Sequence, residues 1–327
     1  MSLPPPSGVV APAAGPRVAI LLSTCNGTAF LPEQLRSFQD QTHRDWTLFW
    51  RDDGSTDDTV AVMERFAAAE PRCIRIDAPA GRLGATASFL ALLCAVAPRI
   101  GPADLVAFSD QDDVWLPAKL ARGVAALTGA GRTVGVPALY CARQRVVDAG
   151  LRRIAASPRL RHPPGFRAAL AQNVAVGCTI LLNPPAVTLI AGLRAPQRTY
   201  HDWWCYLAVT AAGGQCLHDD VEVILYRQHS GNSVGTPRST PRRVMAALRR
   251  GPTAFMNLLR GHLAALAARP EVLSATARDD VVLLDMALRG GVRERLGALR
   301  TLRLRRQTLA ETAALYLWFL LGGSGGR

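Results

Sequence analysis

The chain has 327 residues, of which 49% are hydrophobic and 19% charged, a composition typical of a globular protein and not of a disordered or fibrous one. This length can bury one sizeable core and leaves room for an appendage. The seven cysteines are scattered without any C-x-x-C pair, which argues against a disulfide framework or a zinc site and favours reduced thiols in the cytosol.

The net charge of +13 is unevenly distributed, because residues 236–327 hold sixteen arginines and only six acids. A basic tail of this kind is expected to meet an anionic surface, either lipid headgroups or nucleic acid. Residues 1–16 contain five prolines, make a poor signal peptide and are expected to be disordered. No apolar run reaches the roughly 18 residues of a membrane-spanning helix, so none is expected.

The first part of the chain predicts alternating strands and helices. Apolar runs predict strands at 18–23, 46–50, 73–78 and 105–110, and amphipathic segments between them predict helices at 32–42, 57–70 and 84–97. This order favours an α/β fold with a doubly wound, mostly parallel sheet. Ligands of such sheets bind outside the carboxyl ends of the strands.

Beyond Trp115 the pattern is mixed. We expect helices at 116–127 and 201–214, strands at 137–147 and 221–227, and a glycine-containing loop that runs into a strand at 173–183. The sequence therefore predicts three parts: a tail (1–16), an α/β domain (17–235) and an Arg-rich helical region (236–327).

Acidic residues follow two of the predicted strands. Asp110, Asp112 and Asp113 come after the fourth strand, and Asp52 and Asp53 after the second. Carboxylates crowded in this way repel one another unless a cation lies between them, and this spacing suits Mg²⁺ or Mn²⁺ bound together with a diphosphate. The alternatives are a solvated acidic turn for the first group and an ordinary strand-to-helix turn for the second.

These motifs resemble a known family. VAILLSTCNG, WRDDGSTDDT and FSDQDDVW look like the nucleotide-sugar half of inverting family 2 glycosyltransferases, which have the GT-A fold, a mixed, mostly parallel sheet flanked by helices. Together with HDWW and LYRQHSGN, they are similar to bacterial rhamnosyltransferase-like enzymes that build surface polysaccharides. The resemblance covers residues 17–235.

The resemblance implies a role for each matching residue. It places Ser23, Cys25, Asn26, Asp52 and Asp53 at the nucleotide, Asp110 and Asp112 in a metal-binding DxD pair beside the donor, and Gly177 near the donor sugar. Asp113 shares or takes over the metal role, His229 completes the metal site, and Arg227 meets the diphosphate. For His229 the alternative is a surface or otherwise satisfied side chain. The following segment, 230–235, is expected to be a loop that closes over the donor.

Asp202 falls where the family keeps its catalytic acid, and we expect it to take the proton of the acceptor hydroxyl. Many members have Glu-Asp at this place, whereas this chain has His-Asp, which puts a catalytic role for His201 in doubt. The alternative for Asp202 is a helix N-cap. Trp203 or Trp204 can stack on a sugar face, while the other is expected in the core.

The tail carries arginines between apolar residues, at positions 293, 295, 300, 303, 305 and 306. They indicate an amphipathic helix on anionic lipid, at the inner face of the plasma membrane, with Tyr316, Trp318 and Phe319 at the interface. The alternative is a solvated basic helix face that packs on its own domain. Nucleic-acid binding is disfavoured because no aromatic and basic recognition motif is present.

The leading hypothesis is an inverting, metal-dependent glycosyltransferase that uses Mn²⁺ or Mg²⁺. Its donor would be dTDP-rhamnose or a UDP-hexose, and its acceptor a glycan or a lipid-linked sugar. A sugar-nucleotide nucleotidyltransferase is the alternative enzyme, although STCNGTAF lacks the basic residue of its phosphate loop. A non-catalytic membrane- or nucleic-acid-binding protein would have no need of five clustered acids, and a P-loop NTPase is excluded by its missing motif.

Overall fold

The computed structural model describes residues 15–77, 79, 81–129, 133–229 and 240–321. Most of the predicted N-terminal tail and the predicted closing loop at 230–235 lie outside these residues. The strands are β1 (Val18–Thr24), β2 (Trp46–Asp52), β3 (Cys73–Arg75), β4 (Leu105–Ser109), β5 (Val114–Trp115), β6 (Ala138–Val147), β7 (Arg153–Ala156), β8 (Leu181–Leu182) and β9 (Gln215–Arg227).

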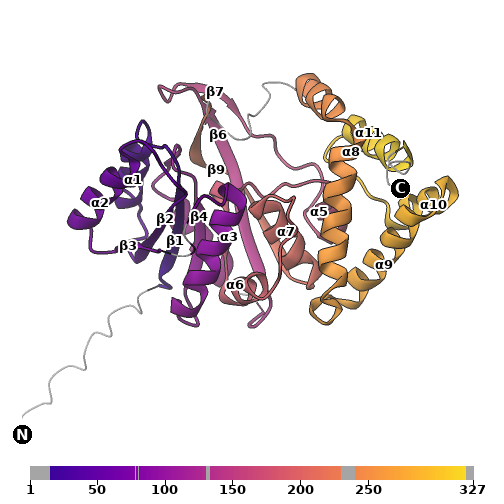
Figure 1. Cartoon of the computed structure of the whole chain (residues 1–327), viewed down its shortest axis with the longest axis horizontal. Helices are drawn as coiled ribbons and strands as arrows, with labels where there is room; N and C mark the ends of the chain where they lie inside the picture. Colours follow the sequence, from indigo (N-terminus) through magenta and orange to yellow (C-terminus); the bar gives the residue numbers. More distant parts are fainter. Residues whose placement is uncertain (1–14, 78, 80, 130–132, 230–239, 322–327) are drawn as a thin grey trace, which may run out of the picture.

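Helices cover both faces of the sheet that these strands form (Figure 1). They are α1 (Leu31–Gln39), α2 (Thr59–Ala69), α3 (Ala85–Val96), α4 (Lys119–Thr128), α5 (Phe166–Ala171), α6 (Pro184–Ala191), α7 (His201–Ala211), α8 (Thr240–Ala267), α9 (Ala275–Arg289), α10 (Val292–Leu302) and α11 (Leu309–Leu321). The predicted α/β class with a mixed sheet is confirmed.

The order of strands along the sheet is β3-β2-β1-β4-β8-β6-β9-β5, with β7 paired to β6. The strands β1 to β4 run parallel to one another, as their βα repeats require. The strand β8 then pairs antiparallel with both β4 and β6, whereas β6 and β9 run parallel to each other. Two successive reversals make β6 and β9 point the same way as β4, so their carboxyl ends reach the same edge of the sheet.

Alternating side chains of β1 show why its sequence is a continuous apolar run. Val18, Ile20 and Leu22 pack in one core cluster with α1, α2 and α4. Ala19 and Leu21 pack in a second cluster with α3 and α5 to α7. Because both faces of this strand are buried, its sequence is apolar throughout and does not alternate between apolar and polar residues.

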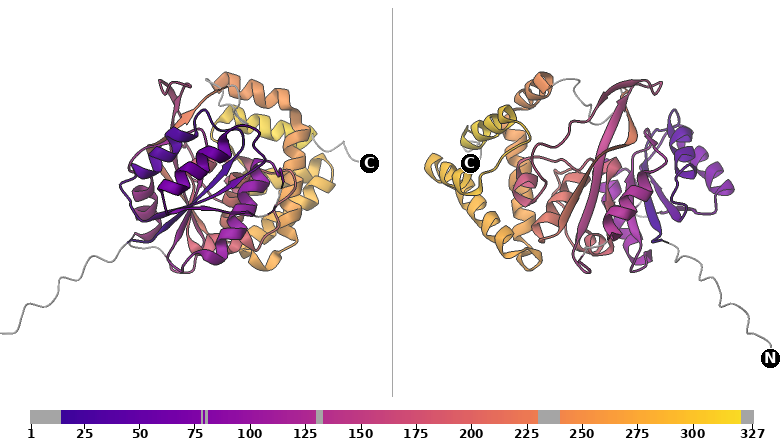
Figure 2. Two further views of the ribbon diagram at one scale, coloured as in Figure 1. Left: turned by 60° about the vertical axis from the view of Figure 1, so that its left-hand side comes forward. Right: turned by 180° about the vertical axis from the view of Figure 1, so that it is seen from behind.

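The C-terminal helices α8 to α11 pack on the side of the sheet that carries α7, away from α1 and α2 (Figure 2). Their apolar side chains, among them Met256, Leu284, Leu299 and Phe319, belong to the same core cluster as α3 and α7. The predicted helical character of this region is therefore observed, and its apolar face is built into the core of the molecule.

Candidate active site

The two predicted acidic groups and the segment with Ser23, Cys25 and Asn26 meet at one edge of the sheet. In the register of the parallel strands, Thr24 at the end of β1 pairs with Asp52 of β2, and Leu22 pairs with Ser109 of β4. Because β1 lies between β2 and β4, the segments that follow the three strands are neighbours. This edge is where an open α/β sheet binds its ligands.

The side chain of Asp52 closes the turn after β2. Its carboxylate accepts hydrogen bonds from the backbone N–H groups of Gly54 (3.0 Å) and Ser55 (2.8 Å) and from the hydroxyl of Thr24 (3.0 Å). Bonds of this kind are typical of an aspartate that stabilises a turn. Asp52 thereby ties the ends of β1 and β2 together.

Asp53, which was predicted to contact the nucleotide base, makes its contacts inside the protein. It is 3% exposed, forms an ion pair with Arg51 at 2.7 Å, and accepts hydrogen bonds from the N–H groups of Leu83 (2.7 Å) and Gly84 (2.8 Å). Both of its oxygens are thus occupied inside the protein. We attribute to Asp53 the support of the loop before α3, because contact with a base would require these bonds to break.

The end of β1 is held by a residue that the sequence analysis did not single out. The side-chain amide of Gln111 accepts a hydrogen bond from Cys25 N–H at 2.8 Å and donates one to Cys25 O at 2.9 Å. A Cβ atom at Gly27 would lie 2.3 Å from Gln111 Oε1, so this close approach requires glycine. The only sequence signal was the position of Gln111 inside the acidic string.

Ser23 and Asn26, predicted to lie at the nucleotide, contact α3 and the turn after β2, respectively. The hydroxyls of Ser23 and Ser88 are 2.6 Å apart, and Arg51 also donates to Ser88 at 2.7 Å. Asn26 is exposed and adopts a left-handed conformation with φ of 49°, which asparagine tolerates, and its N–H donates to Ser55 Oγ at 2.9 Å. These groups form the wall of the site beside the acidic string.

The acidic string after β4 is crowded and short of hydrogen-bond donors. Ligand atoms of Asp110, Asp113 and Cys178 all lie within 4.8 Å of one another. Burial, reinforced by the charges of Asp112 and Asp202, raises the pKa of Asp110 to about 7. Burial also raises the pKa of the Asp113 carboxyl well above its usual range, and the charges of Asp110 and Asp112 raise it further.

Asp112 pairs with the predicted metal ligand His229. The Nε2 atom of His229 lies 2.8 Å from Asp112 Oδ2, and the His229 ring packs against Phe30 with centroids 4.7 Å apart. The structure thus divides the predicted ligand set into two adjacent groups, Asp110 with Asp113 and Asp112 with His229.

Arg227 lies inside the protein, whereas the sequence analysis expected its side chain to meet the diphosphate. Its side chain is 2% exposed and donates to the backbone oxygen of Asp112 at 2.8 Å, to that of Ala149, and to the carboxylate of Glu33. Its own N–H donates to Asp113 Oδ1 at 3.0 Å. Arg227 therefore holds the acidic string in shape, and reaching a diphosphate would cost it these bonds.

A buried lysine lies beneath the same string. Lys119 is 0% exposed, its Nζ lies 3.4 Å from the centroid of the Trp115 ring, and burial lowers its pKa to about 7. Asp113 and Cys178 oppose this lowering through their charges. No pattern in the sequence indicates this lysine, because its position at the start of a helix is typical of an exposed side chain.

A divalent cation fits the acidic string. The Oδ2 atom of Asp113 is buried and has no hydrogen-bond partner among the described residues, and a hard dication would satisfy it and offset the repulsion with Asp110. Cys178 is a softer ligand than these metals prefer, and burial raises the pKa of its thiol, so we regard it as part of the wall.

Asp202 faces the string from another element, the first turn of α7. Its two carboxylate oxygens accept hydrogen bonds from Trp203 N–H at 2.6 Å and from Gly177 N–H at 3.1 Å. Burial raises the pKa of Asp202 to about 6, although these hydrogen bonds oppose the rise. The predicted loop glycine and the predicted acid are thus direct partners.

The neighbouring His201 is an aromatic packing residue. Its ring stacks on Phe89 with centroids 4.3 Å apart and meets the edge of Phe108 at 5.1 Å. Burial lowers its pKa to about 3, so it stays neutral. A Cβ atom at Gly177 would lie 2.6 Å from His201 Nε2, which explains why glycine is needed there.

The two tryptophans of α7 pack inside the protein. Trp204 is 0% exposed, as expected for a core residue. Trp203 donates from its ring nitrogen to Ala169 O at 2.7 Å and packs against Phe255 of α8. This packing turns the Trp203 ring toward the C-terminal helices, so the predicted stacking on a sugar would require it to leave α8.

The tail arginines divide into buried and exposed ones. Arg295 donates to backbone oxygens of Gly290 (3.0 Å) and Leu320 (3.2 Å), and Arg306 donates to Ala171 O (2.9 Å) and lies over the ring of Trp318. The exposed ones are Arg293, Arg300, Arg303 and Arg305.

The predicted interfacial position of Trp318 and Phe319 is wrong, because their apolar rings are buried in the core, at 5% and 0% exposure. Within the described ranges, no helix combines the length and hydropathy needed to cross a membrane.

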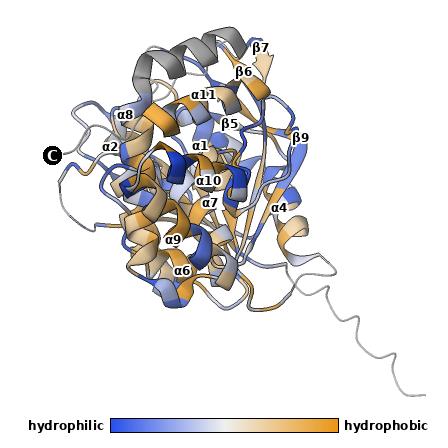
Figure 3. Cartoon of the chain, turned by 90° about the vertical axis from the view of Figure 1, so that its right-hand side faces the viewer, coloured by the Kyte–Doolittle hydropathy of each residue, from blue (hydrophilic) through white to orange (hydrophobic). Residues whose placement is uncertain are grey.

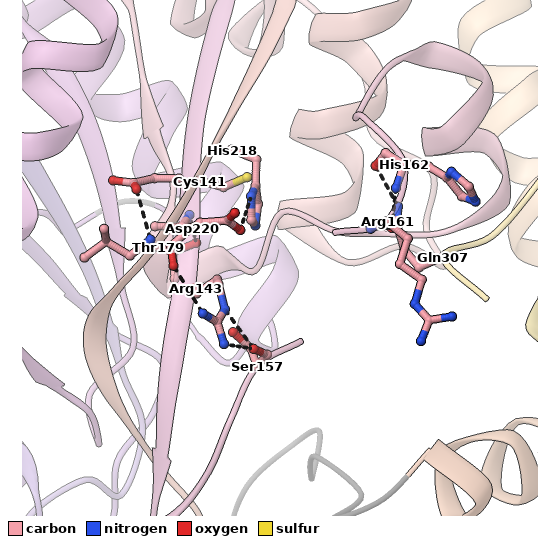
Figure 4. Close-up of polar contacts among 12 residues, drawn as sticks. Cys141, Arg143, Ser157, Arg161, His162, Thr179, His218, Asp220 and Gln307 are labelled. Atoms are coloured by element: carbon pink, nitrogen blue, oxygen red, sulfur yellow. Dashed lines mark hydrogen bonds and ion pairs between the residues drawn. The ribbon is translucent and has the colours of Figure 1, made fainter. Parts of the chain in front are cut away.

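An open cavity of about 890 Å³ lies away from this site, beside the first half of β9 and α4. Figure 4 shows polar contacts near the lining residues Arg161 and Asp220: Arg143 donates to Ser157 O at 2.6 and 2.9 Å, and Gln307 accepts from the N–H of Arg161 at 2.7 Å. The cavity includes His218 and Asp220, at the opposite end of β9 from Arg227. It is therefore separate from the acidic string.

Comparison with known proteins defines the class of this one. Residues 19–180, about half of the chain, match the family model "Glycosyl transferase family 2". This match includes the ends of β1, β2 and β4, where the site lies. The chain belongs to this family and is a glycosyltransferase with the GT-A fold.

Particular relatives agree with this class. The chain is 29% identical over 225 residues to the dTDP-rhamnosyl transferase RfbG of Shigella flexneri, which covers 65% of this chain and 73% of that protein. Its fold is similar to that of S. aureus TarS solved with UDP-GlcNAc, with a TM-score of 0.55, 12% identity and coverage of 92% and 89%. It is also similar to that of a mannosyltransferase of Pyrobaculum calidifontis in complex with GDP-Man and Mn²⁺. For this pair the TM-score is 0.50, the identity 17%, and the coverage 95% of this chain and 88% of the other.

Proposed function

We propose that the protein transfers a sugar with inversion from a nucleoside-diphosphate donor, with dTDP-rhamnose favoured, to a glycan or lipid-linked acceptor in bacterial surface-polysaccharide synthesis. The choice of rhamnose is supported by the 29% identity to a dTDP-rhamnosyl transferase over 65% of the chain. The nucleotide-sugar class is also supported by structural neighbours that were solved with UDP-GlcNAc and with GDP-Man.

One observation carries the proposal most directly. Asp202 belongs to α7 and has its own hydrogen-bond partners, yet its charge contributes to the raised pKa of Asp110. The site therefore offers two separate sets of carboxylates next to each other. A glycosyl transfer needs this arrangement, because the base at the acceptor and the ligands at the diphosphate cannot be the same group.

In this proposal Asp202 takes the proton of the acceptor hydroxyl as its oxygen attacks the anomeric carbon. The N–H groups of Gly177 and Trp203 fix the carboxylate and leave lone pairs free to accept that proton. A pKa of about 6 keeps the group ionised at neutral pH and still basic enough to act. A single attack with one base inverts the anomeric configuration.

The acidic string would hold Mn²⁺ or Mg²⁺ through Asp110 and Asp113, with Asp112 and His229 beside them. When bound, such a cation supplies Lewis-acid stabilisation of the departing diphosphate. Arg227 would act by positioning the string through its bonds to Asp112 and Asp113.

We also propose that α9 to α11 contact an anionic membrane surface at the cytoplasmic face. Exposed apolar side chains occur there beside the exposed arginines, among them Met286 (65%), Val292 (55%) and Leu321 (61%). Figure 3, which faces these helices, shows hydrophilic and hydrophobic residues along them. Such a surface suits a lipid-linked acceptor.

The proposal is tested by incubating the protein with dTDP-rhamnose, UDP-glucose, UDP-galactose or GDP-mannose, with Mn²⁺ or with EDTA. We expect release of dTDP from dTDP-rhamnose only with Mn²⁺, and NMR of the sugar product should show the inverted anomer. Retention of configuration, or equal release in EDTA, would contradict the mechanism. Consumption of another donor alone would correct the sugar.

A further inference from the structure

The C-terminal helix α8 reaches the element that carries Asp202 through a buried histidine. His262 is 1% exposed, and its Nε2 lies 2.7 Å from the hydroxyl oxygen of Thr199. Thr199 lies two residues before α7 and three before Asp202. The hydrogen bond therefore joins the appended helices to the segment from which the first turn of α7 starts.

The ring of His262 is fixed by the two tryptophans of α7. It stacks on Trp204 with centroids 6.0 Å apart and meets the edge of Trp203 at 5.6 Å. Burial lowers the pKa of His262 to about 4, so the ring is neutral at neutral pH and brings no charge near Asp202. The packed ring of His262 therefore offers the Thr199 hydroxyl a hydrogen-bond partner in a fixed position.

Thr199 is also tied to the donor side of the site. Its backbone oxygen accepts a hydrogen bond from the hydroxyl of Thr86 at 3.1 Å. Thr86 belongs to the first turn of α3, where Ser88 contacts both Ser23 and Arg51. Thr199 thus joins α3, which borders the β1 and β2 ends, to α8.

We propose that His262 and Thr199 form a latch through which α8 positions Asp202 for proton transfer. The inference rests on the proposed role of Asp202 as the base. Gly177 and Trp203 hold the Asp202 carboxylate only while the start of α7 keeps its place, and a base displaced by about 1 Å can lose around a hundredfold in rate. His262 and Thr199 are positioning residues, since neither is expected to touch a substrate.

The test compares Thr199→Val, which removes the hydroxyl and keeps the shape, with Thr199→Ser, which keeps the hydroxyl. We expect Thr199→Val to lower kcat about tenfold or more while the Kd of the donor, titrated with Mn²⁺, stays within about twofold. Thr199→Ser should restore most of kcat. Thr188→Val, the same change at an exposed position of α6, is the matched control.

A second readout is independent of activity. Because Gly177 N–H donates to Asp202, we expect hydrogen exchange at Gly177 to quicken about fivefold or more in Thr199→Val and to stay unchanged in Thr199→Ser and Thr188→Val. If the wild type turns over no donor, the proposed function fails while exchange still tests the latch. A folded Thr199→Val with wild-type kcat and exchange, or a parallel loss of kcat and donor affinity, would overturn the latch.

Discussion

The acids after β2 and the acids after β4 occupy equivalent places, yet the fold treats them in opposite ways. Asp52 and Asp53 are each surrounded by donors, namely backbone N–H groups, the Thr24 hydroxyl and the Arg51 guanidinium. Asp110 and Asp113 instead face each other and a buried thiol, and Asp113 keeps an oxygen without a partner among the described residues.

This difference shows that the number of donors around a carboxylate matters more than its place in a motif. An acid whose oxygens are all bonded inside the protein contributes to stability. An acid that is buried without enough donors is costly, and such groups gather where a ligand will satisfy them. The two strand ends should therefore respond differently to the same Asp→Asn substitution.

The largest effect is expected at Asp202, which belongs to neither of these two groups and lies in α7. Replacing Asp202 with Asn should lower turnover by about 10²–10⁴-fold, because the base is lost, while donor binding changes little. Steady-state kinetics and donor calorimetry measure the two quantities. Asp148→Asn, in the exposed turn after β6, serves as control, and an Asp202→Asn variant with normal turnover would disprove the role of base.

Asp53→Asn should act on stability. The change leaves the Arg51 guanidinium buried without its ion-pair partner, so the free energy of unfolding should fall by about 3 kcal/mol. Urea unfolding measures it, with Asp58→Asn at an exposed position as control. A wild-type stability together with lost nucleotide binding would instead restore Asp53 as a contact to the base.

The string after β4 should show the reverse behaviour in protein freed of metal by chelation. The pKa of Asp110 is about 7 in the folded chain, against about 3.9 for an unfolded aspartate. Between these values the folded state binds more protons, so stability should fall as the pH rises from about 4 to about 8.

Asp110→Asn should remove part of this fall and at pH 8 stabilise the metal-free protein by on the order of 2 kcal/mol. Thermal unfolding at pH 5 and pH 8 measures the effect. Destabilisation by Asp110→Asn at pH 8 would show that this carboxylate is satisfied within the fold, as those after β2 are.

The smallest effect is expected for membrane binding, where exposed arginines of the C-terminal region are compared with arginines bonded inside the protein. Arg300 and Arg303 are exposed, and Arg295 and Arg306 are bound to backbone oxygens. Changing Arg300 and Arg303 to Gln should each weaken binding to phosphatidylserine vesicles by about 1 kcal/mol. Vesicle sedimentation measures this, with Arg65→Gln of α2 as control. If Arg65→Gln weakened vesicle binding as much as Arg300→Gln and Arg303→Gln, the membrane would not bind specifically to the face formed by α9 to α11.

The sequence predicted those parts of the fold that carry strong local patterns. The apolar runs of β1, β2 and β4 and the amphipathic helices between them were found, whereas β8 has two residues and its pairing with β4 and β6 is a tertiary property. The helix α6 was missed because its Pro-Pro start is typical of a loop as well as of a helix N-terminus.

For the site, residue type identified the acids but not their environments. Asp53 and Arg227 satisfy other parts of the protein, a fact that depends on the loop before α3 and on Glu33. Lys119 and His262 gave no local signal, since a lysine and a histidine in helices are usually exposed or structural. Their roles follow only from what the fold packs around them.

The most direct test of this account is calorimetric titration of dTDP-rhamnose into the wild type, Asp110→Asn and Asp52→Asn, each with and without Mn²⁺. We predict Mn²⁺-dependent binding to the wild type, its loss in Asp110→Asn, and its persistence in Asp52→Asn, provided that protein remains folded. Donor binding by Asp110→Asn that still depends on Mn²⁺ would contradict the claim that the acids after β4 hold the metal and the diphosphate.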